Sequence, residues 1–400
     1  EEEVCIGSIE ELNEGIRKAN QVLGGTVNAN YLHEGILDLH KPYVDEIVLV
    51  SESGKPMKRV PDLIDVWFDS GAMPYAQWHY PFENLHKVSG TNGAAEAFPA
   101  DFICEGVDQT RGWFYTLHVL GVMLFDSVAY KSVVSNGLVL DKDGNKMSKR
   151  LGNVVDPFKT IEQFGADATR WYLITNASPW DNLKFDLDGI REVQRKFFGT
   201  LYNTYQFFAL YANVDGFTFI EAYIPVKERP EIDQWILSSL HSLVKKVSMY
   251  MNDYEPTLAG RAVEEFVGEQ LSNWYVRLCR RRFWKGEYEK DKICAYQTLY
   301  ECLETVVRLI APTSPFFSDA IFRNLNAVTG LNKAESVHHA DFPVFEPSVI
   351  DPSLEERMQM AQDASSLILS IRKKVNIRVR QPLQKALITV MNPEMEKQLK

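Results

Sequence analysis

Paired cysteines are absent from this sequence. Its five cysteines are scattered along the chain, and no two of them form a C-x-x-C pair. An odd, scattered set supports neither a disulfide framework nor a zinc knuckle. The eight histidines show no metal-ligand spacing either. We therefore expect buried, reduced thiols in a cytoplasmic protein, and no metal site.

A membrane-spanning run and a signal peptide are also missing. No apolar stretch approaches the length that crosses a bilayer, so we expect no membrane partner. Residues 1–7 carry no initiator methionine and no basic or apolar leader, which indicates a chain taken from the middle of a longer sequence. With 400 residues, of which 45% are hydrophobic, the chain can bury the cores of two or three domains.

Basic residues are outnumbered by acidic ones. The net charge of −11 argues against indiscriminate nucleic-acid binding, which depends on counterion release by many Lys and Arg side chains. Local basic patches that contact one folded RNA stay compatible with this charge.

Strands and helices alternate in the first half of the chain. A short apolar strand at 101–104 precedes a helix at 110–125 and a second strand at 132–135. Strand, helix and strand form the βαβ unit of a parallel sheet, whose ligands bind at the carboxyl ends of the strands. Polar residues follow both strands, at 105–109 and 136–137. This pattern predicts half of a Rossmann-like α/β domain.

Helices follow one another in the second half. Apolar residues recur at helical spacing in 232–251, and Pro256 can open a helix that runs to about residue 284. A third helix at 291–311 ends before Pro312. These segments predict an all-α bundle of antiparallel helices.

The chain divides into four predicted parts. They are a connective segment that packs on its neighbour (1–60), the half-domain (61–187), the helical bundle (188–335) and the beginning of a further domain (336–400). The first part contains an expected helix at 9–22 and a strand at 46–50. The last contains a helix at 358–375 and an extended piece at 387–390.

A lysine-rich segment follows the second strand. Residues 146–150 (KMSKR) lie in a polar stretch, and we name residues 141–153 the lysine loop. Two lysines three residues apart, with Ser148 between them, make a mobile cationic arm. Such an arm can neutralise the charge of a triphosphate as pyrophosphate leaves. For an isolated match, a solvated loop without a ligand is an equal alternative.

The lysine loop stands in a fixed order with further motifs. They are 65–71 (DVWFDSG), 105–114 (EGVDQTRGWF), 165–170 (GADATR), 273–277 (NWYVR) and 280–284 (RRRFW). In this order the chain resembles the isoleucine-type class I aminoacyl-tRNA synthetases, from about residue 26 to 390. In that family the run at 108–114 is the isoleucine version, and the valine-type enzyme is the nearest alternative.

The resemblance implies a site for isoleucine. Trp67 and Trp113 would wall an apolar pocket for its side chain. Glu105, Asp108 and Gln109 would hold the amino group and the aminoacyl-adenylate. The structural alternatives are that the tryptophans are core aromatics and that Asp108 caps the following helix.

The resemblance also implies a site for ATP, which would act as a substrate together with Mg²⁺. Lys146, Ser148 and Lys149 would be the catalytic residues of the lysine loop, with Lys149 the strongest phosphate ligand. Glu105 and its neighbour Gly106 would contact the adenylate. Gly137, at a strand end, would let the adenine approach the backbone.

A cluster of cations and aromatics falls on one predicted helix, which we name the basic helix (273–285). Its candidate tRNA-binding residues are Trp274, Arg277, Arg280, Arg281, Arg282 and Lys285. Cations among aromatics suit phosphate contacts and base stacking. In the family this helical domain binds the anticodon region. The alternative is that the aromatics are core and the arginines solvated or paired. A second cluster at 372–380 is equally compatible with a charged helix end.

Two parts of the family are absent from this sequence. It contains no His-Ile-Gly-His-like motif and no editing domain. We therefore expect a fragment, inactive alone, that works with a missing N-terminal part, isoleucine, ATP and tRNA(Ile) in a monomeric enzyme. Two other functions stay open: a non-catalytic synthetase-derived tRNA-binding module, and a different nucleotidyl transferase, against which the long helical part argues.

Overall fold

The structure is a computed structural model that describes residues 2–29, 31–89, 95–385, 387–390, 393 and 396. The chain forms two compact units. The first consists of Glu1–Asp101 and Thr110–Lys131, and the second of Phe102–Gln109 and Ser132–Lys400. The four-part division predicted from the sequence stays a prediction.

The first unit begins with helix α1 (Ile9–Leu23) packed on the hairpin of β3 (Val48–Val50) and β4 (Pro56–Lys58). Ser8 caps α1 by accepting a hydrogen bond from the Glu11 amide. A second, smaller hairpin pairs β1 (Leu32–His33) with β2 (Ile36–Leu37). The predicted helix and strand of this segment are thus confirmed.

Short helices complete the first unit: α2 (Val66–Gly71), α3 (Met73–Ala76), α4 (Leu85–Val88) and the longer α5 (Trp113–Phe125). Helix α2 packs closely on α5 because Gly71 has no side chain. A Cβ at this position would lie 2.9 Å from a methyl carbon of Leu120 and 3.1 Å from the carbonyl carbon of Thr116.

Strands β5 (Ala100–Gly106) and β6 (Tyr130–Asn136) pair in a two-stranded sheet, and α5 lies between them in the sequence. This is the predicted order of strand, helix and strand. Two shorter strands, β7 (Val139–Leu140) and β8 (Leu183–Lys184), pair in parallel. The extended piece predicted at 387–390 forms no strand with any described residue.

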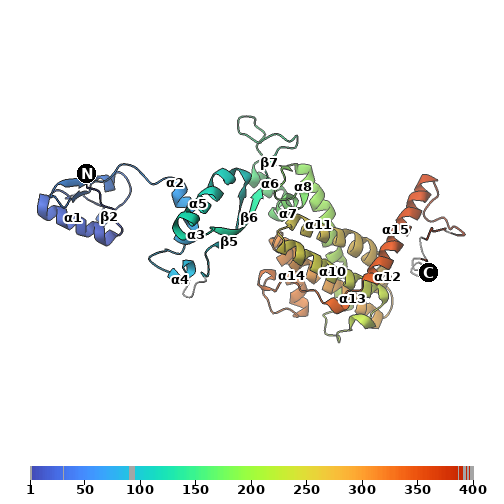
Figure 1. The fold of residues 1–400 in the computed structure, drawn as a ribbon. Coiled ribbons are helices and arrows are strands. Elements are labelled where there is room, and N and C mark those ends of the chain that lie inside the picture. The colour runs from blue at the N-terminus through green and yellow to red at the C-terminus, as the bar shows by residue number, and fades with distance from the viewer. Residues whose placement is uncertain are drawn as a thin grey trace. The chain divides into compact units, whose positions relative to one another are not determined.

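Helices dominate the second unit. They are α6 (Pro157–Phe164), α7 (Ala166–Asn176), α8 (Leu187–Val193), α9 (Gly199–Asp215), α10 (Glu231–Asn252), α11 (Pro256–Glu265), α12 (Arg277–Trp284), α13 (Lys290–Ile310), α14 (Pro315–Thr329) and α15 (Pro352–Lys374). Helices α10, α11 and α13 pack against one another (Figure 1). Large side chains such as Trp171, Trp235 and Tyr296 fill one continuous core.

The basic helix is the end of a longer helix. From α11 the chain continues through a π-helical segment (Phe266–Val276) into α12 without leaving helical backbone angles. The helix predicted from Pro256 to about residue 284 is therefore confirmed. The sequence did not indicate the π-helical segment, a feature that occurs frequently at functional sites.

Candidate functional site

The lysine loop is closed by two side chains, Asp141 and Asn153. Asp141 Oδ1 accepts hydrogen bonds from the amides of Asp143, at 3.0 Å, and Asn145, at 2.7 Å. Asn153 Nδ2 donates to Asp141 Oδ2 at 2.9 Å, and Asn153 Oδ1 accepts from the Ser148 amide at 2.9 Å. These bonds fix both ends of the loop and its centre.

The loop presents its cations outward and its apolar residue inward. Lys146 and Lys149 are exposed, and neither forms an ion pair within the described part of the chain. Met147, between them in the sequence, packs on the hydrophobic core of the second unit. Anchoring one residue of the loop in the core leaves the two ammonium groups available to a ligand.

Hydrogen bonds also set the charge of Asp141. The amide of Asn153, followed by the backbone amide of Asn145, lowers the pKa of the Asp141 carboxyl below its ordinary value. The carboxylate is therefore ionised at neutral pH and accepts the hydrogen bonds from Asp143, Asn145 and Asn153.

The predicted ligands of the amino group and adenylate lie at the end of β5 and directly after it, in the second unit. Glu105 and Asp108 are exposed, and Gln109 Nε2 donates to Asp108 Oδ2 at 3.1 Å. Gly106 lies close beside them, since a Cβ there would lie 2.6 Å from Asp108 Oδ1. Helix α5 has Gly112, not Asp108, at its N-cap, so the alternative of Asp108 as a helix cap is wrong.

Gly137 follows β6 and contacts the chain's own backbone. Its amide donates to the Pro179 carbonyl at 2.8 Å, and a Cβ would lie 2.2 Å from the Asp181 carbonyl oxygen. The structure thus gives a packing reason for a glycine here, besides the predicted approach of adenine. Asn136 Nδ2 lies 3.1 Å from the sulfur of Cys104, which links the ends of β5 and β6.

The two tryptophans predicted to wall the isoleucine pocket lie in the first unit. Trp67, on α2, is 43% exposed. Trp113, at the beginning of α5, is partly buried, and its Nε1 donates to the Ser70 carbonyl at 3.0 Å. Neither belongs to the buried core, which contradicts the alternative that they are core aromatics.

Most of the basic helix is exposed, as an RNA-binding surface requires. Its exposed cations are Arg277, Arg280, Arg281 and Lys285. Arg277 lies 5.9 Å from the centre of the Trp274 ring, within cation–π range. The predicted alternative of core aromatics holds for Tyr275 and Phe283, which are buried.

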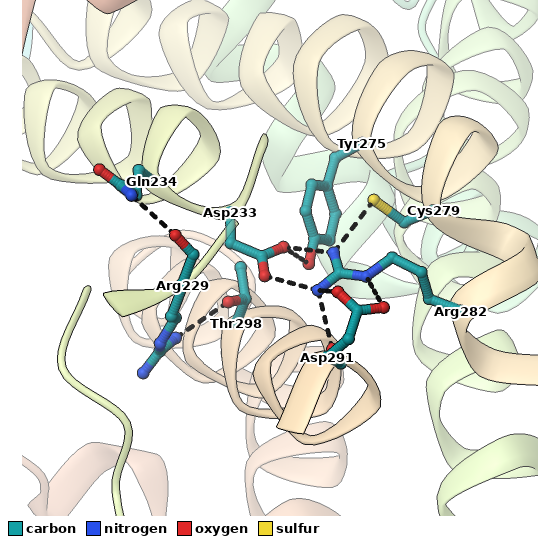
Figure 2. Close-up of polar contacts among 8 residues, drawn as sticks. All are labelled: Arg229, Asp233, Gln234, Tyr275, Cys279, Arg282, Asp291 and Thr298. Atoms are coloured by element: carbon teal, nitrogen blue, oxygen red, sulfur yellow. Dashed lines mark hydrogen bonds and ion pairs between the residues drawn. The ribbon is translucent and has the colours of Figure 1, made fainter. Parts of the chain in front are cut away.

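Arg282 differs from its neighbours because its guanidinium is engaged inside the bundle (Figure 2). It binds both carboxylate oxygens of the buried Asp233, each at 2.7 Å, and reaches the carboxylate of Asp291 at 3.0 Å. Tyr275 donates to the same Asp233 at 2.7 Å. Burial opposes the charge of Arg282, but Asp233 outweighs it and raises the pKa of the guanidinium. Arg282 is therefore not a candidate tRNA-binding residue. Its guanidinium stabilises the helical bundle instead, through Asp233.

Asp233 belongs to a wider polar network on α10, the π-helical segment, α12 and α13. Burial and the neighbouring Asp233 carboxylate raise the pKa of the Tyr275 hydroxyl well above its ordinary value. Burial also raises the pKa of the Cys279 thiol to about 11, so this cysteine is a neutral thiol. Sequence reasoning missed Asp233, because one acidic residue on an apolar helix gives no signal of its distant partner.

The described residues contain no group of three or more His, Cys, Asp or Glu side chains that could hold a metal ion. Within the same residues, no helix is both long and apolar enough to span a bilayer. A cavity of about 680 Å³ lies within the second unit, lined by residues of 192–200 and 261–273, away from the lysine loop in sequence.

Two family models match the chain. The model described as "tRNA synthetases class I (I, L, M and V)" matches residues 11–186, and the "Anticodon-binding domain of tRNA ligase" matches residues 233–387. The first match contains the lysine loop, and the second contains the basic helix.

Several similar proteins are isoleucine–tRNA ligases by name. The isoleucine–tRNA ligase of Cytophaga hutchinsonii is 63% identical over 100% of this chain and 35% of its own length, and that of Bacteroides thetaiotaomicron is 60% identical over 98% of this chain and 34% of its own. That of Thermus thermophilus is 46% identical over 88% of this chain and 33% of its own. The chain thus spans about a third of the length of these curated relatives.

A solved structure has a similar fold. The LeuRS of Agrobacterium radiobacter K84, in a ternary complex with tRNA and LeuAMS, aligns with a TM-score of 0.58 over 77% of this chain and 36% of that chain. The sequence identity is 20%, so this likeness concerns the fold alone.

Proposed function

The chain belongs to the class I tRNA synthetases, and from this premise we propose that it is part of an isoleucine–tRNA ligase. The observation that carries the proposal is 63% identity, over the whole of this chain, to a protein of that name. The parent enzyme would activate isoleucine with ATP and transfer it to tRNA(Ile). The fold would be half of a Rossmann-like domain with its lysine loop, followed by the anticodon-binding bundle.

In the first step, the isoleucine carboxylate attacks the α-phosphorus of ATP, and pyrophosphate leaves. Negative charge moves onto the leaving oxygens, where the ammonium groups of Lys146 and Lys149 would stabilise it. The exposure of both lysines, on a loop closed by Asp141 and Asn153, supports this role. The hydroxyl of Ser148 would add a neutral hydrogen bond.

Binding of the amino acid would divide between polar and apolar residues. Glu105, Asp108 and Gln109 offer the carboxylate and amide oxygens that suit an ammonium group. Trp67 and Trp113 offer flat apolar surfaces for the aliphatic side chain. Gly106 and Gly137 are proposed near the adenylate. Mg²⁺ would arrive on the phosphates of ATP, since this ion keeps few protein ligands in such sites.

The bundle is proposed to bind tRNA(Ile) through Trp274, Arg277, Arg280, Arg281 and Lys285. Four exposed cations on one helix can release counterions from RNA locally, despite the acidic net charge. We place the parent enzyme in the cytoplasm as a monomer.

Isoleucine-dependent ATP–pyrophosphate exchange tests the enzymatic proposal. The enzyme at the length of its relatives should exchange with isoleucine in preference to valine, and Lys149→Ala should lower kcat/KM by roughly 100-fold or more. Lys142→Ala, on the same loop, is the matched control and should retain activity. The 400-residue chain alone should be inactive. Tight tRNA binding without exchange in the full-length enzyme would instead identify a non-catalytic tRNA-binding module.

A further inference from the structure

The last carbonyl groups of helix α7 accept hydrogen bonds from side chains of another helix. The last carbonyls of an α-helix have no partner within the helix. Here α11 supplies the donors. Arg261 Nε donates to the Thr175 carbonyl at 2.9 Å, and its Nη2 donates to the Asn176 carbonyl at 3.1 Å. The buried hydroxyl of Thr257 lies 2.7 Å from the Ile174 carbonyl oxygen.

Four positions on one face of α11 make this contact, which we name the clasp: Thr257, Gly260, Arg261 and Glu264. Their spacing places them on successive turns of one helical stripe. A Cβ at Gly260 would lie 2.6 Å from a methyl carbon of Thr175, so the Thr175 side chain packs directly on the backbone of Gly260. At the far end of the stripe, Glu264 accepts a hydrogen bond from Trp171 Nε1 at 2.7 Å.

The clasp connects directly to the basic helix. Since α11 continues through the π-helical segment into α12, Arg261 and Arg277 lie on one continuous helix. A ligand that binds the exposed face of α12 is therefore connected to α7 through a continuous helix rather than through a loop.

A second set of contacts leads from α7 to the lysine loop. Asn176 Nδ2 donates to the Tyr172 hydroxyl at 3.2 Å, and that hydroxyl donates to the Lys184 carbonyl at 3.0 Å. Lys184 ends β8, which pairs in parallel with β7 through Leu140. Asp141, the next residue, closes the lysine loop.

The residues after α7 hold the strand before the loop as well. The Gly137 amide donates to Pro179, and the Leu138 amide donates to Asn182 Oδ1 at 2.8 Å. Two routes thus join the C-terminus of α7 to the base of the lysine loop, and every residue on them belongs to the second unit.

We propose that Arg261 is a positioning residue through which tRNA bound on the basic helix orders the lysine loop. The inference rests on the proposed function and adds to it one residue that couples the basic helix to the lysine loop. Arg261 touches neither ligand in this scheme. Its two charge-assisted bonds set the position of α7, and α7 sets the position of the strands that carry the loop.

The test is hydrogen exchange of the lysine loop in the full-length enzyme, with and without tRNA(Ile). In the wild type, tRNA should slow exchange in the peptide 141–153 by roughly fivefold or more. In Arg261→Ala this protection should be lost, while the tRNA Kd changes less than about threefold. Aminoacylation kcat should fall by roughly tenfold. Arg261→Lys, which keeps the charge but loses the fork, should recover part of the protection.

Arg170→Ala is the matched control. Arg170 also donates to two carbonyls beyond a helix end, those of Thr313 and Pro312, but it connects α7 to α13 rather than to α11. The Arg170→Ala variant should lower the free energy of unfolding about as much as Arg261→Ala does, and tRNA should still slow hydrogen exchange of its lysine loop. Should Arg261→Ala fail to fold, Thr257→Val removes one donor of the clasp at constant volume.

The outcomes separate this inference from the proposed function. Two results would contradict the role of Arg261 and leave the proposed ligase function standing. One is an active wild type in which tRNA does not slow hydrogen exchange of the lysine loop. The other is an Arg261→Ala variant in which tRNA slows this exchange as much as in the wild type. Equal loss of protection in Arg170→Ala also contradicts this role, because destabilisation alone would then account for the effect. A wild type that activates no isoleucine overturns the function itself.

Discussion

Asn153 holds the lysine loop closed against Asp141. Its amide nitrogen donates to Asp141 Oδ2 at 2.9 Å, and its amide oxygen accepts from the Ser148 amide at 2.9 Å. One side chain therefore joins the beginning of the loop to the segment between its two lysines. Because a primary amide is both donor and acceptor, no other common side chain of this size can make both bonds.

Asn153→Asp should impair the loop more than Asn153→Ala. A carboxylate can still accept from Ser148, but it cannot donate to Asp141 and places a like charge beside it. We expect kcat/KM for ATP in pyrophosphate exchange to fall by about 10-fold in the alanine variant and by up to about 100-fold in the aspartate variant, since misplaced groups cost this much. Lys142→Ala serves as the control. A fully active Asn153→Asp variant would contradict the role of Asn153 in closing the lysine loop.

Arg282→Ala should destabilise the bundle by about 3–5 kcal/mol, because it leaves the carboxylate of Asp233 buried without its partner. The urea midpoint of the full-length enzyme reports this change. The neighbouring exposed Arg281→Ala should shift the midpoint little. Replacing the pair together, as Asp233→Leu with Arg282→Met, should recover most of the loss. A double variant no more stable than Arg282→Ala would show that the network contributes beyond charge pairing.

Local patterns predicted much of the fold. The apolar spacing of 232–251 gave α10 nearly at its observed ends, and Pro256 marked the first residue of α11. What the patterns could not give depends on contacts between distant segments. The pairing of β7 with β8 joins residues more than 40 positions apart, and neither two-residue strand has a local signal.

In the candidate site too, local motifs were predictable from the sequence, whereas contacts between distant residues were not. Motifs identified Lys146, Lys149 and the basic helix, and the structure finds these cations exposed. Sequence reasoning included Arg282 with its neighbours, because a run of arginines does not reveal which one turns inward. The i, i+4 spacing of Cys279 and Phe283, both buried, was the available signal that α12 has an inner face.

Arg281→Ala should weaken tRNA binding without affecting stability. Removing one phosphate contact lowers affinity for RNA and reduces the slope of log Kd against log salt by about 0.7–0.9. Measurements at several salt concentrations with the full-length enzyme would show this change. Arg323→Ala, an exposed arginine on α14 paired with Asp319, is a control of equal charge change. Equal effects of the two variants would mean that only net charge matters, and that the basic helix is no specific surface.

Glu264→Gln should stabilise the enzyme at alkaline pH. Burial raises the pKa of the Glu264 carboxyl above its ordinary 4.5, although Trp171 and Arg261 oppose the shift. Between pH 4.5 and the raised value, the folded state holds a proton that the unfolded state releases, so stability falls as pH rises through this window. Glutamine has no such proton, and its oxygen still accepts from Trp171 Nε1. The variant's Tm should exceed that of the wild type at pH 8, and the difference should shrink toward pH 4. A less stable variant at pH 8 would instead mean that Arg261 keeps this carboxylate ionised in the clasp.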